Sequence, residues 1–365
     1  MVSGFYLYIN MISSNTIYEV DTVLHADSVE WCPINNYQDY LLCGTYQLKS
    51  CAIKSDDTDS RIGCLQLYQI DNKSNIEDFK LKQVFQVDVV GVLDMKWCNQ
   101  PLLENMPTLA TADAHGSVKL FSLYIDQHKK AKMKNWCEVL NPNSVALSLD
   151  WSSKQCTKDI QIAASYSNGN LGLLKVCESD AVLLQQWNAH GFEAWITAFN
   201  SENDSVLYSG GDDCCFRGWD LRCPEHSLFN NRSHDMGVCS IQSCPSNSNL
   251  LATGGYDEHV RIWDVRAMRP KPLTNLNVNG GVWRVKWHPK LKDVLAVACM
   301  HNGCFILHQD QVSLNLCSRA HYTNHQSLAY GIDWCYLENS VSHFLASCSF
   351  YDHKLCLWNL NKQLL

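Results

Sequence analysis

The sequence predicts an all-β fold: a seven-bladed β-propeller formed by residues 1–365 and closed by a strand from its N-terminal segment. Two observations support this prediction. A strand-rich unit recurs seven times, and the last copy has no room for a fourth strand of its own. Because each unit is long enough for a four-stranded sheet and its loops, seven copies can surround a central axis as a single domain.

The repeat is clearest in two segments that align without a gap, 207–220 and 251–264. Both contain Gly-Gly followed by a turn aspartate, and both end in Trp-Asp, with Trp219 and Trp263 lying 44 residues apart. Weaker copies follow the same frame at intervals of 44 to 53 residues. Their equivalent positions are Tyr68, Phe121, Leu174, Trp219, Trp263, Leu307 and Trp358. This spacing is typical of propeller blades.

Each copy also carries a short strand upstream of that position. These strands are rich in β-branched, aromatic and aliphatic residues, and turn residues bound them, as expected for radially repeated sheets. They occupy residues 29–31, 93–97, 147–151, 195–199, 238–241, 283–287 and 331–334.

Ring closure follows from the last copy. Trp358 ends its third strand and only seven residues follow, so the chain cannot easily supply a fourth strand there. The segment at about 15–21, which includes Ile17 and Val20, precedes the first full repeat. We expect it to pair with the last blade, because an unpaired sheet edge is a liability.

Composition excludes several classes of partner. A net charge of −8 without basic clusters argues against nucleic acid, and no apolar stretch is long enough to cross a membrane. Nineteen cysteines, many within apolar runs such as those around Cys299 and Cys348, predict free thiols and a cytoplasmic location. No Cys-x-x-Cys pair occurs, so no metal site is expected.

His190, Ser209 and Asp213 resemble a serine hydrolase triad in their residue types. However, the next copy repeats the set at identical spacing as His234, Thr253 and Asp257, as a structural element would. In repeats of the WD40 type, which these resemble, such residues form a buried hydrogen-bond relay that ends at a tryptophan. We therefore interpret both sets as scaffold. The other common catalytic motifs are absent.

Several stretches are more particular than a general WD repeat. Examples are Ala298-Cys-Met-His-Asn-Gly303, Ser327-Leu-Ala-Tyr-Gly-Ile-Asp-Trp334 and the segment 190–199. Together they resemble the WD-repeat diphthine methyl esterase family, densely from 190 to 358. The resemblance implies a carboxylic ester hydrolase that removes the methyl ester from methylated diphthine on elongation factor 2, without a cofactor.

The implied substrate carries a trimethylammonio group beside the ester, and such a cation favours a cage of aromatic rings. The particular motifs supply five rings at positions that usually face the rim or channel: Trp195, Tyr256, Trp283, Tyr330 and Tyr351. We expect these rings to bind substrate. The alternative is that they only pack the inner strands.

Ester hydrolysis also needs a base and a group that stabilises an oxyanion. Glu193 and Asp212 are candidates for cation binding or for the base, and Arg284 for the oxyanion or a carboxylate. His301 occupies the turn-aspartate position of the sixth copy, so it either replaces that aspartate or acts as the base. Attack by water is favoured slightly over a covalent route through Ser327.

Two other functions remain open. Arg222 and Arg266 end consecutive Trp-Asp-x-Arg boxes, which resemble the docking motif of substrate receptors in cullin-RING ubiquitin ligases. The chain would then be a non-enzymatic adaptor, although each box is equally compatible with a local Asp–Arg salt bridge. An aromatic cage with an acidic rim also suits methylated histone tails.

Overall fold

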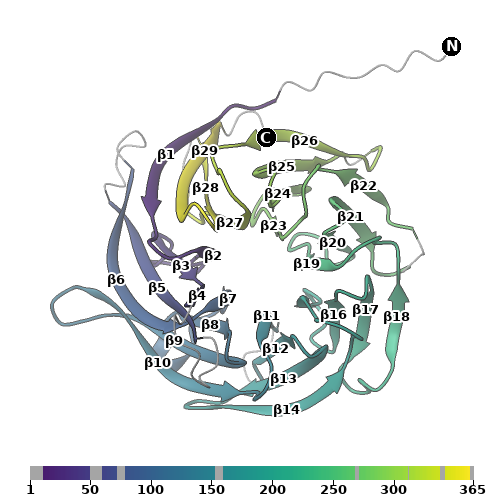
Figure 1. Ribbon diagram of the computed structural model, residues 1–365, viewed down its shortest axis with the longest axis horizontal. Coiled ribbons are helices and arrows are strands. Elements are labelled where there is room, and N and C mark those ends of the chain that lie inside the picture. Colours follow the sequence, from purple (N-terminus) through teal and green to yellow (C-terminus); the bar gives the residue numbers. More distant parts are fainter. Residues whose placement is uncertain are drawn as a thin grey trace.

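The computed structural model describes residues 11–49, 60–71, 79–152, 159–267, 271–310, 312–337 and 342–361. Seven antiparallel sheets are arranged like blades around a central axis, with strands β2, β7, β11, β19, β23 and β27 closest to that axis (Figure 1). The predicted fold class, an all-β seven-bladed propeller, is confirmed. Apart from the 3-10 turn Leu103–Asn105, the described residues form no helix, and so none that could span a bilayer.

In blades 2 to 6 the strands follow one another from the axis outward, whereas in blade 1 both β4 and β6 pair with β5. Blade 1 contains β2 (Ala26–Trp31), β3 (Tyr40–Thr45), β4 (Gln47–Lys49), β5 (Ser60–Asp71) and β6 (Lys80–Val90). Blade 2 contains β7 (Val92–Trp97), β8 (Thr108–Asp113), β9 (Ser117–Ile125) and β10 (Ala131–Leu140). Blade 3 contains β11 (Ala146–Trp151), β12 (Gln161–Tyr166), β13 (Asn170–Val176) and β14 (Ala181–Asn188).

The next three blades repeat the plan. Blade 4 contains β15 (Ile196–Phe199), β16 (Val206–Gly210), β17 (Phe216–Asp220) and β18 (Ser227–Asn231). Blade 5 contains β19 (Val238–Ser243), β20 (Leu250–Gly255), β21 (His259–Asp264) and β22 (Thr274–Asn277). Blade 6 contains β23 (Arg284–Trp287), β24 (Val294–Ala298), β25 (Cys304–Gln309) and β26 (Leu316–Tyr322).

Blade 7 is built from both ends of the chain. From the axis outward it contains β27 (Ala329–Trp334), β28 (Ser342–Ser349) and β29 (Lys354–Asn361), and its outermost strand is β1 (Ser14–Asp21). The β1–β29 pairing is antiparallel, and Ile17, Tyr18 and Val20 pack on the apolar core between blades 7 and 1. The N-terminal strand therefore closes the ring, as predicted.

Tryptophans at the ends of the inner strands tie adjacent blades together. The indole Nε1 of Trp97 donates to the Glu30 carbonyl oxygen of the preceding blade at 3.3 Å. Trp151 and Trp334 repeat this bond with the carbonyls of Lys96 and Lys286, both at 2.9 Å. Because the bond recurs from blade to blade, it fixes the end of each inner strand relative to its neighbour.

Candidate functional site

The inner strands end at equivalent residues: Trp31, Trp97, Trp151, Phe199, Ser243, Trp287 and Trp334. Each inner strand has a residue four positions before its last residue, and we call the set of these seven residues the mouth ring. Its members are Asp27, Leu93, Leu147, Trp195, Cys239, Trp283 and Tyr330. In five blades this residue is the extra residue of a β-bulge, which breaks the regular pairing at the start of the strand.

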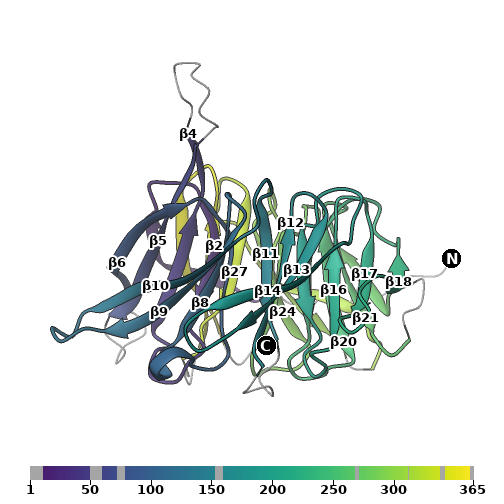
Figure 2. The ribbon, with the colours of Figure 1, turned by 90° about the horizontal axis from the view of Figure 1, so that it is seen from below.

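The mouth ring surrounds the aromatic mouth of the channel, on the face of the propeller from which β4 projects (Figure 2). Tyr46, immediately before β4, contacts Phe350, and Phe350 contacts Tyr330 of the ring. The opposite opening lies at the ends of the inner strands, and we call it the polar mouth.

Four of the predicted rings meet at the aromatic mouth. The ring centroids of Trp195 and Trp283 are 5.6 Å apart, and Tyr256 lies 6.2 Å and 6.0 Å from these two. Tyr330 lies 4.8 Å from Trp283. Residues from blades 4, 5, 6 and 7 therefore form one continuous aromatic cluster, of the kind that attracts an organic cation by cation–π interaction.

An acidic group orients one of these rings. The indole Nε1 of Trp195 donates to Asp212 Oδ1 at 3.1 Å, and the backbone N–H of Asp212 donates to the carbonyl of Glu193 at 2.9 Å. Asp212 is exposed and Glu193 is half-buried. The two carboxyl groups therefore belong to the rim beside the rings.

Tyr351 and His301 lie outside the cluster. Tyr351 is 65% exposed and contacts Phe350 and His25 rather than the four rings. His301 is exposed in the turn between β24 and β25 and has no hydrogen-bond partner among the described residues. The structure does not bring it together with Glu193 and Asp212 into one catalytic group.

Arg284 is buried and crosses the channel. Its Nη1 atom lies 3.0 Å from Asp94 Oδ1, which joins blade 6 to blade 2. Together with Trp195, Trp283, Leu147 and Cys239, Arg284 lines a small pocket beneath the rings. Sequence reasoning expected Arg284 to meet a ligand directly. It missed Asp94, because the two residues lie far apart in the chain and only the closed ring makes them neighbours.

Sequence reasoning also missed Asp27, the one carboxyl group of the mouth ring. Its side chain is buried, and its Oδ1 atom has no hydrogen-bond partner among the described residues. Burial raises the pKa of Asp27 to about 8; the nearby Arg284 opposes this shift and Asp94 adds to it. An alignment of the seven inner strands on their last residues would have identified Asp27 as the acidic member of the mouth ring.

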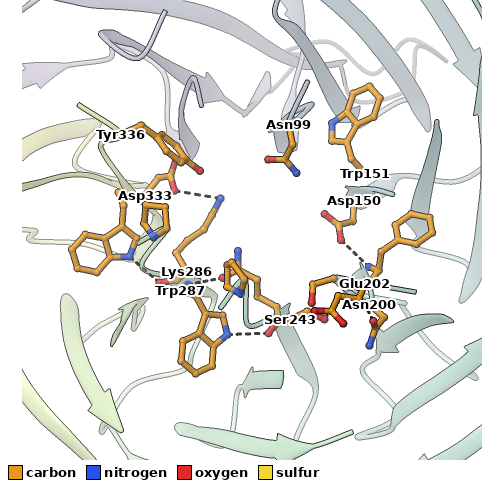
Figure 3. Close-up of a pocket in the computed structure, with 16 residues that line it drawn as sticks. Asn99, Asp150, Trp151, Asn200, Glu202, Ser243, Lys286, Trp287, Asp333 and Tyr336 are labelled. Carbon is orange, nitrogen blue, oxygen red and sulfur yellow. Dashed lines mark hydrogen bonds and ion pairs between the residues drawn. The ribbon is translucent and has the colours of Figure 1, made fainter. Parts of the chain in front are cut away.

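The polar mouth contains paired charges and amides. Lys286 Nζ lies 2.5 Å from Glu30 Oε1 and 3.6 Å from Asp333 Oδ1, and Figure 3 shows Lys286 and Asp333 pointing toward each other. Asp150 Oδ2 accepts the backbone N–H of Phe199 at 2.8 Å, and its Oδ1 lies 3.4 Å from Lys96. Glu30, Asp150 and Asp333 therefore each have a lysine partner.

The two triad-like sets are hydrogen-bond relays. His190 bonds Asp213 at 2.8 Å and Ser209 at 2.7 Å, and Ser209 accepts the indole N–H of Trp219 at 2.8 Å. His234, Thr253, Asp257 and Trp263 repeat the arrangement in blade 5. Both serine and threonine hydroxyls are buried, so neither relay presents a nucleophile to a ligand.

Blade 7 contains a third relay. His325 bonds Ser347 at 2.6 Å and Ser349 at 2.7 Å, and Ser349 donates to Asp352. Burial lowers the pKa of His325 to about 4. Because His325 is committed to these bonds, it does not activate the nearby Ser327, whose hydroxyl accepts the backbone N–H of Tyr351.

The two Trp-Asp-x-Arg boxes close on themselves. Arg222 makes two side-chain bonds to Asp220, at 2.8 and 2.6 Å, and Arg266 does the same with Asp264 at 2.9 and 2.7 Å. Both arginines are exposed, so these are local surface ion pairs of small energy. The described cysteines are all free, and the described residues contain no group of three or more metal-ligating side chains.

Comparison with known proteins identifies relatives of the whole ring. The WD domain, G-beta repeat family matches residues 181–220 and 225–264. The chain is 42% identical to the Diphthine methyltransferase of Mus musculus over 88% of this chain and 70% of the relative. It is 40% identical to that of Homo sapiens, with coverages of 90% and 76%, and 35% identical to the Dictyostelium discoideum homolog, with coverages of 91% and 96%.

A solved structure supports the fold alone. A chain of the "Crystal Structure of Mitotic Checkpoint Complex" superposes with a TM-score of 0.69 at 14% identity, over 99% of this chain and 97% of the other.

The names of the relatives correct one expectation. They denote a transferase, so the prediction of a carboxylic ester hydrolase, a methyl esterase, is wrong. The motifs that carried the resemblance identify a family that handles a methylated group, but they do not specify which bond to the methyl group is made or broken. The names also give no support to the adaptor alternative.

Proposed function

The chain belongs to the diphthine methyltransferase family, and from this membership we propose that it catalyses a methyl-transfer reaction on diphthine during diphthamide biosynthesis. Its protein substrate in this proposal is elongation factor 2, which carries diphthine as a modified histidine. Because that factor works in translation, the proposed site of action is the cytoplasm.

The observation that carries the proposal is the cluster of Trp195, Tyr256, Trp283 and Tyr330 above a small pocket. A methylated ammonium group has its charge spread over methyl hydrogens and loses little on leaving water, so aromatic faces bind it well. Contact with one ring contributes about 0.5–2 kcal/mol, and several rings can act together. In this role the rings bind and orient the modified side chain, and they exclude water from it.

Asp212 and Glu193 are proposed as acidic groups that attract the cation to the rim. The Asp212–Trp195 hydrogen bond fixes the indole plane, so Asp212 also acts as a positioning residue. Tyr351 is proposed to contact the surrounding peptide rather than the cation, because it is exposed on the same face one ring further out. His301 is proposed to have the same peripheral role in blade 6.

Methyl transfer also requires a donor that supplies an electrophilic methyl group when bound. A sulfonium donor is itself a cation with a methyl substituent, so the ring cluster fits it by the same physics. The small pocket beneath Trp195 and Trp283 is lined by the apolar side chains of Leu93, Leu147 and Cys239, and also by the polar Ser148 and Arg284.

The test is methyl transfer to elongation factor 2 whose modified histidine carries fewer methyl groups than diphthine, with purified chain and a sulfonium donor. Mass spectrometry of the modified peptide should show the gain of one methyl group. Trp283→Ala should lower the rate at least tenfold, because Trp283 contacts the other three rings. Trp136→Ala, on the outer strand of blade 2, is the matched control and should transfer like the parent. A well-folded parent that transfers nothing would refute the proposal.

A further inference from the structure

The charges around the aromatic mouth do not balance. Asp27, Asp94 and Arg284 are all buried near one another, and Arg284 forms its ion pair with Asp94. Two carboxyl groups thus share one guanidinium, and Asp27 is left with an unpartnered oxygen. An ionised carboxylate buried without a partner is strongly unfavourable, so burial favours Asp27 in its neutral form.

Asp27 occupies the same layer of the inner strands as residues that line the pocket. It is a member of the mouth ring, and five other members line the pocket: Leu93, Leu147, Trp195, Cys239 and Trp283. The seventh member, Tyr330, is its neighbour from blade 7 and is part of the aromatic cluster. A cation held by the rings would therefore supply the positive charge that this group of side chains lacks.

We propose that Asp27 is the anionic binding residue for the methylated cation held at the aromatic mouth, and that its carboxyl group releases a proton when the cation binds. With the cation in place, the carboxylates of Asp27 and Asp94 face the positive charges of Arg284 and the cation, and the net charge of the cluster is zero. The O–H bond of Asp27 breaks, its electron pair stays on the carboxylate, and the proton passes to solvent. This inference rests on the proposed function only in treating the rings as a cation site.

The proposal predicts the pH dependence of binding. The groups that face Asp27 are Arg284 from β23, Asp94 from β7, Tyr330 from β27 and Cys43 from β3. Because burial raises the pKa of Asp27 to about 8, the carboxyl is mostly neutral at pH 7 and mostly ionised at pH 9. If only the ionised form binds the cation, affinity rises about tenfold over this interval and then levels off.

The experiment is calorimetric titration of the purified chain with choline at pH 7 and pH 9, in buffers of different ionisation enthalpy. Choline represents a trimethylated ammonium, and 3,3-dimethylbutan-1-ol is its neutral counterpart of the same shape. S-Adenosylmethionine in a parallel titration represents a sulfonium, so the stronger probe identifies which cation the site prefers. For the preferred probe we expect about tenfold tighter binding at pH 9 and release of about one proton at pH 7.

Variants separate the role of Asp27 from a structural effect. Asp27→Asn keeps the shape and should lose at least tenfold in cation affinity at pH 9, the proton release and the pH dependence, while the neutral alcohol binds as before. Asp235→Asn removes an exposed carboxylate before β19 and should behave like the parent.

Three results would overturn the inference: equal cation affinity in Asp27→Asn and the parent, cation binding by the parent without proton release, or no cation binding at any pH. Failure of methyl transfer with intact, proton-linked cation binding would instead count against the proposed function alone.

Discussion

The aromatic and polar mouths are formed by the same seven inner strands but differ in chemistry. The mouth ring supplies three aromatic rings, two leucines, a thiol and Asp27. Three residues further along the strands, the corresponding layer is Glu30, Lys96, Asp150, Ala198, Gln242, Lys286 and Asp333. In that layer each carboxyl lies within 3.6 Å of a lysine, whereas Asp27 has no such partner among the described residues. The polar layer is thus complete without a ligand, and the aromatic mouth is not.

Removing the shared scaffold should abolish both mouths at once. Deletion of residues 1–21 removes β1, exposes the edge of β29 and uncovers the core on which Ile17, Tyr18 and Val20 pack. We expect loss of cooperative thermal unfolding, measured by circular dichroism. Deletion of residues 1–10 leaves β1 in place and should unfold like the parent. If the longer deletion keeps the parent's melting temperature, ring closure by β1 is not what holds the blades.

Removing a cation from the polar layer should be costly. Lys286→Met leaves Glu30 and Asp333 buried without their partner, and breaking such a pair costs about 3–5 kcal/mol. Urea unfolding at pH 7 measures the loss. Lys96→Met is the control from the same layer, because Lys96 is more exposed and, within the part of the chain that the structure describes, pairs with Asp150 alone. A similar loss of unfolding free energy in both variants would mean that the Lys286 ion pairs are no more shielded from solvent than the Lys96 pair.

Neutralising Asp27 should raise the free energy of unfolding, whereas Lys286→Met should lower it. The folded pKa of Asp27, about 8, lies above the unfolded value, so the stability that this carboxyl contributes is fully present below about pH 4 and is lost as pH rises toward 8. Asp27→Asn removes that loss, and we expect a gain of about 1–3 kcal/mol at pH 8 and almost none at pH 4. Unfolding in urea at both pH values provides the comparison. A destabilised Asp27→Asn at pH 8 would mean that Asp27 has a partner in the folded protein.

The smallest expected effect concerns the orientation of one ring. Trp195→Phe keeps an aromatic face but removes the hydrogen bond to Asp212. A bond of this kind at an exposed position contributes about 0.5–1 kcal/mol, so KM should rise about two- to fivefold with little change in kcat. Asn200→Ala at the polar mouth is the control and should leave KM unchanged. Equal changes in the two variants would remove the functional distinction between the mouths.

The fold was predictable because its signals are local and repeated. Turn aspartates, terminal tryptophans and inner strands recur in register, and the missing fourth strand after Trp358 indicated β1. The four clustered rings were predicted from their positions in those repeats. Asp94 as the partner of Arg284 was not predictable, because their contact crosses the channel between blades 2 and 6. Asp27 was missed because a carboxyl group at the start of a strand looks like an ordinary turn residue until all seven strands are superposed.

The placement of β1 beside β29 also has a consequence for biosynthesis. The two strands lie at opposite ends of the described chain, so a nascent polypeptide has its outermost strand available long before the partner emerges from the ribosome. Blades 1 to 6 can each form as they are synthesised, but the final sheet waits for the last segment. Until then, a strand with open hydrogen-bonding groups needs protection, and a molecular chaperone that binds extended segments would meet that need.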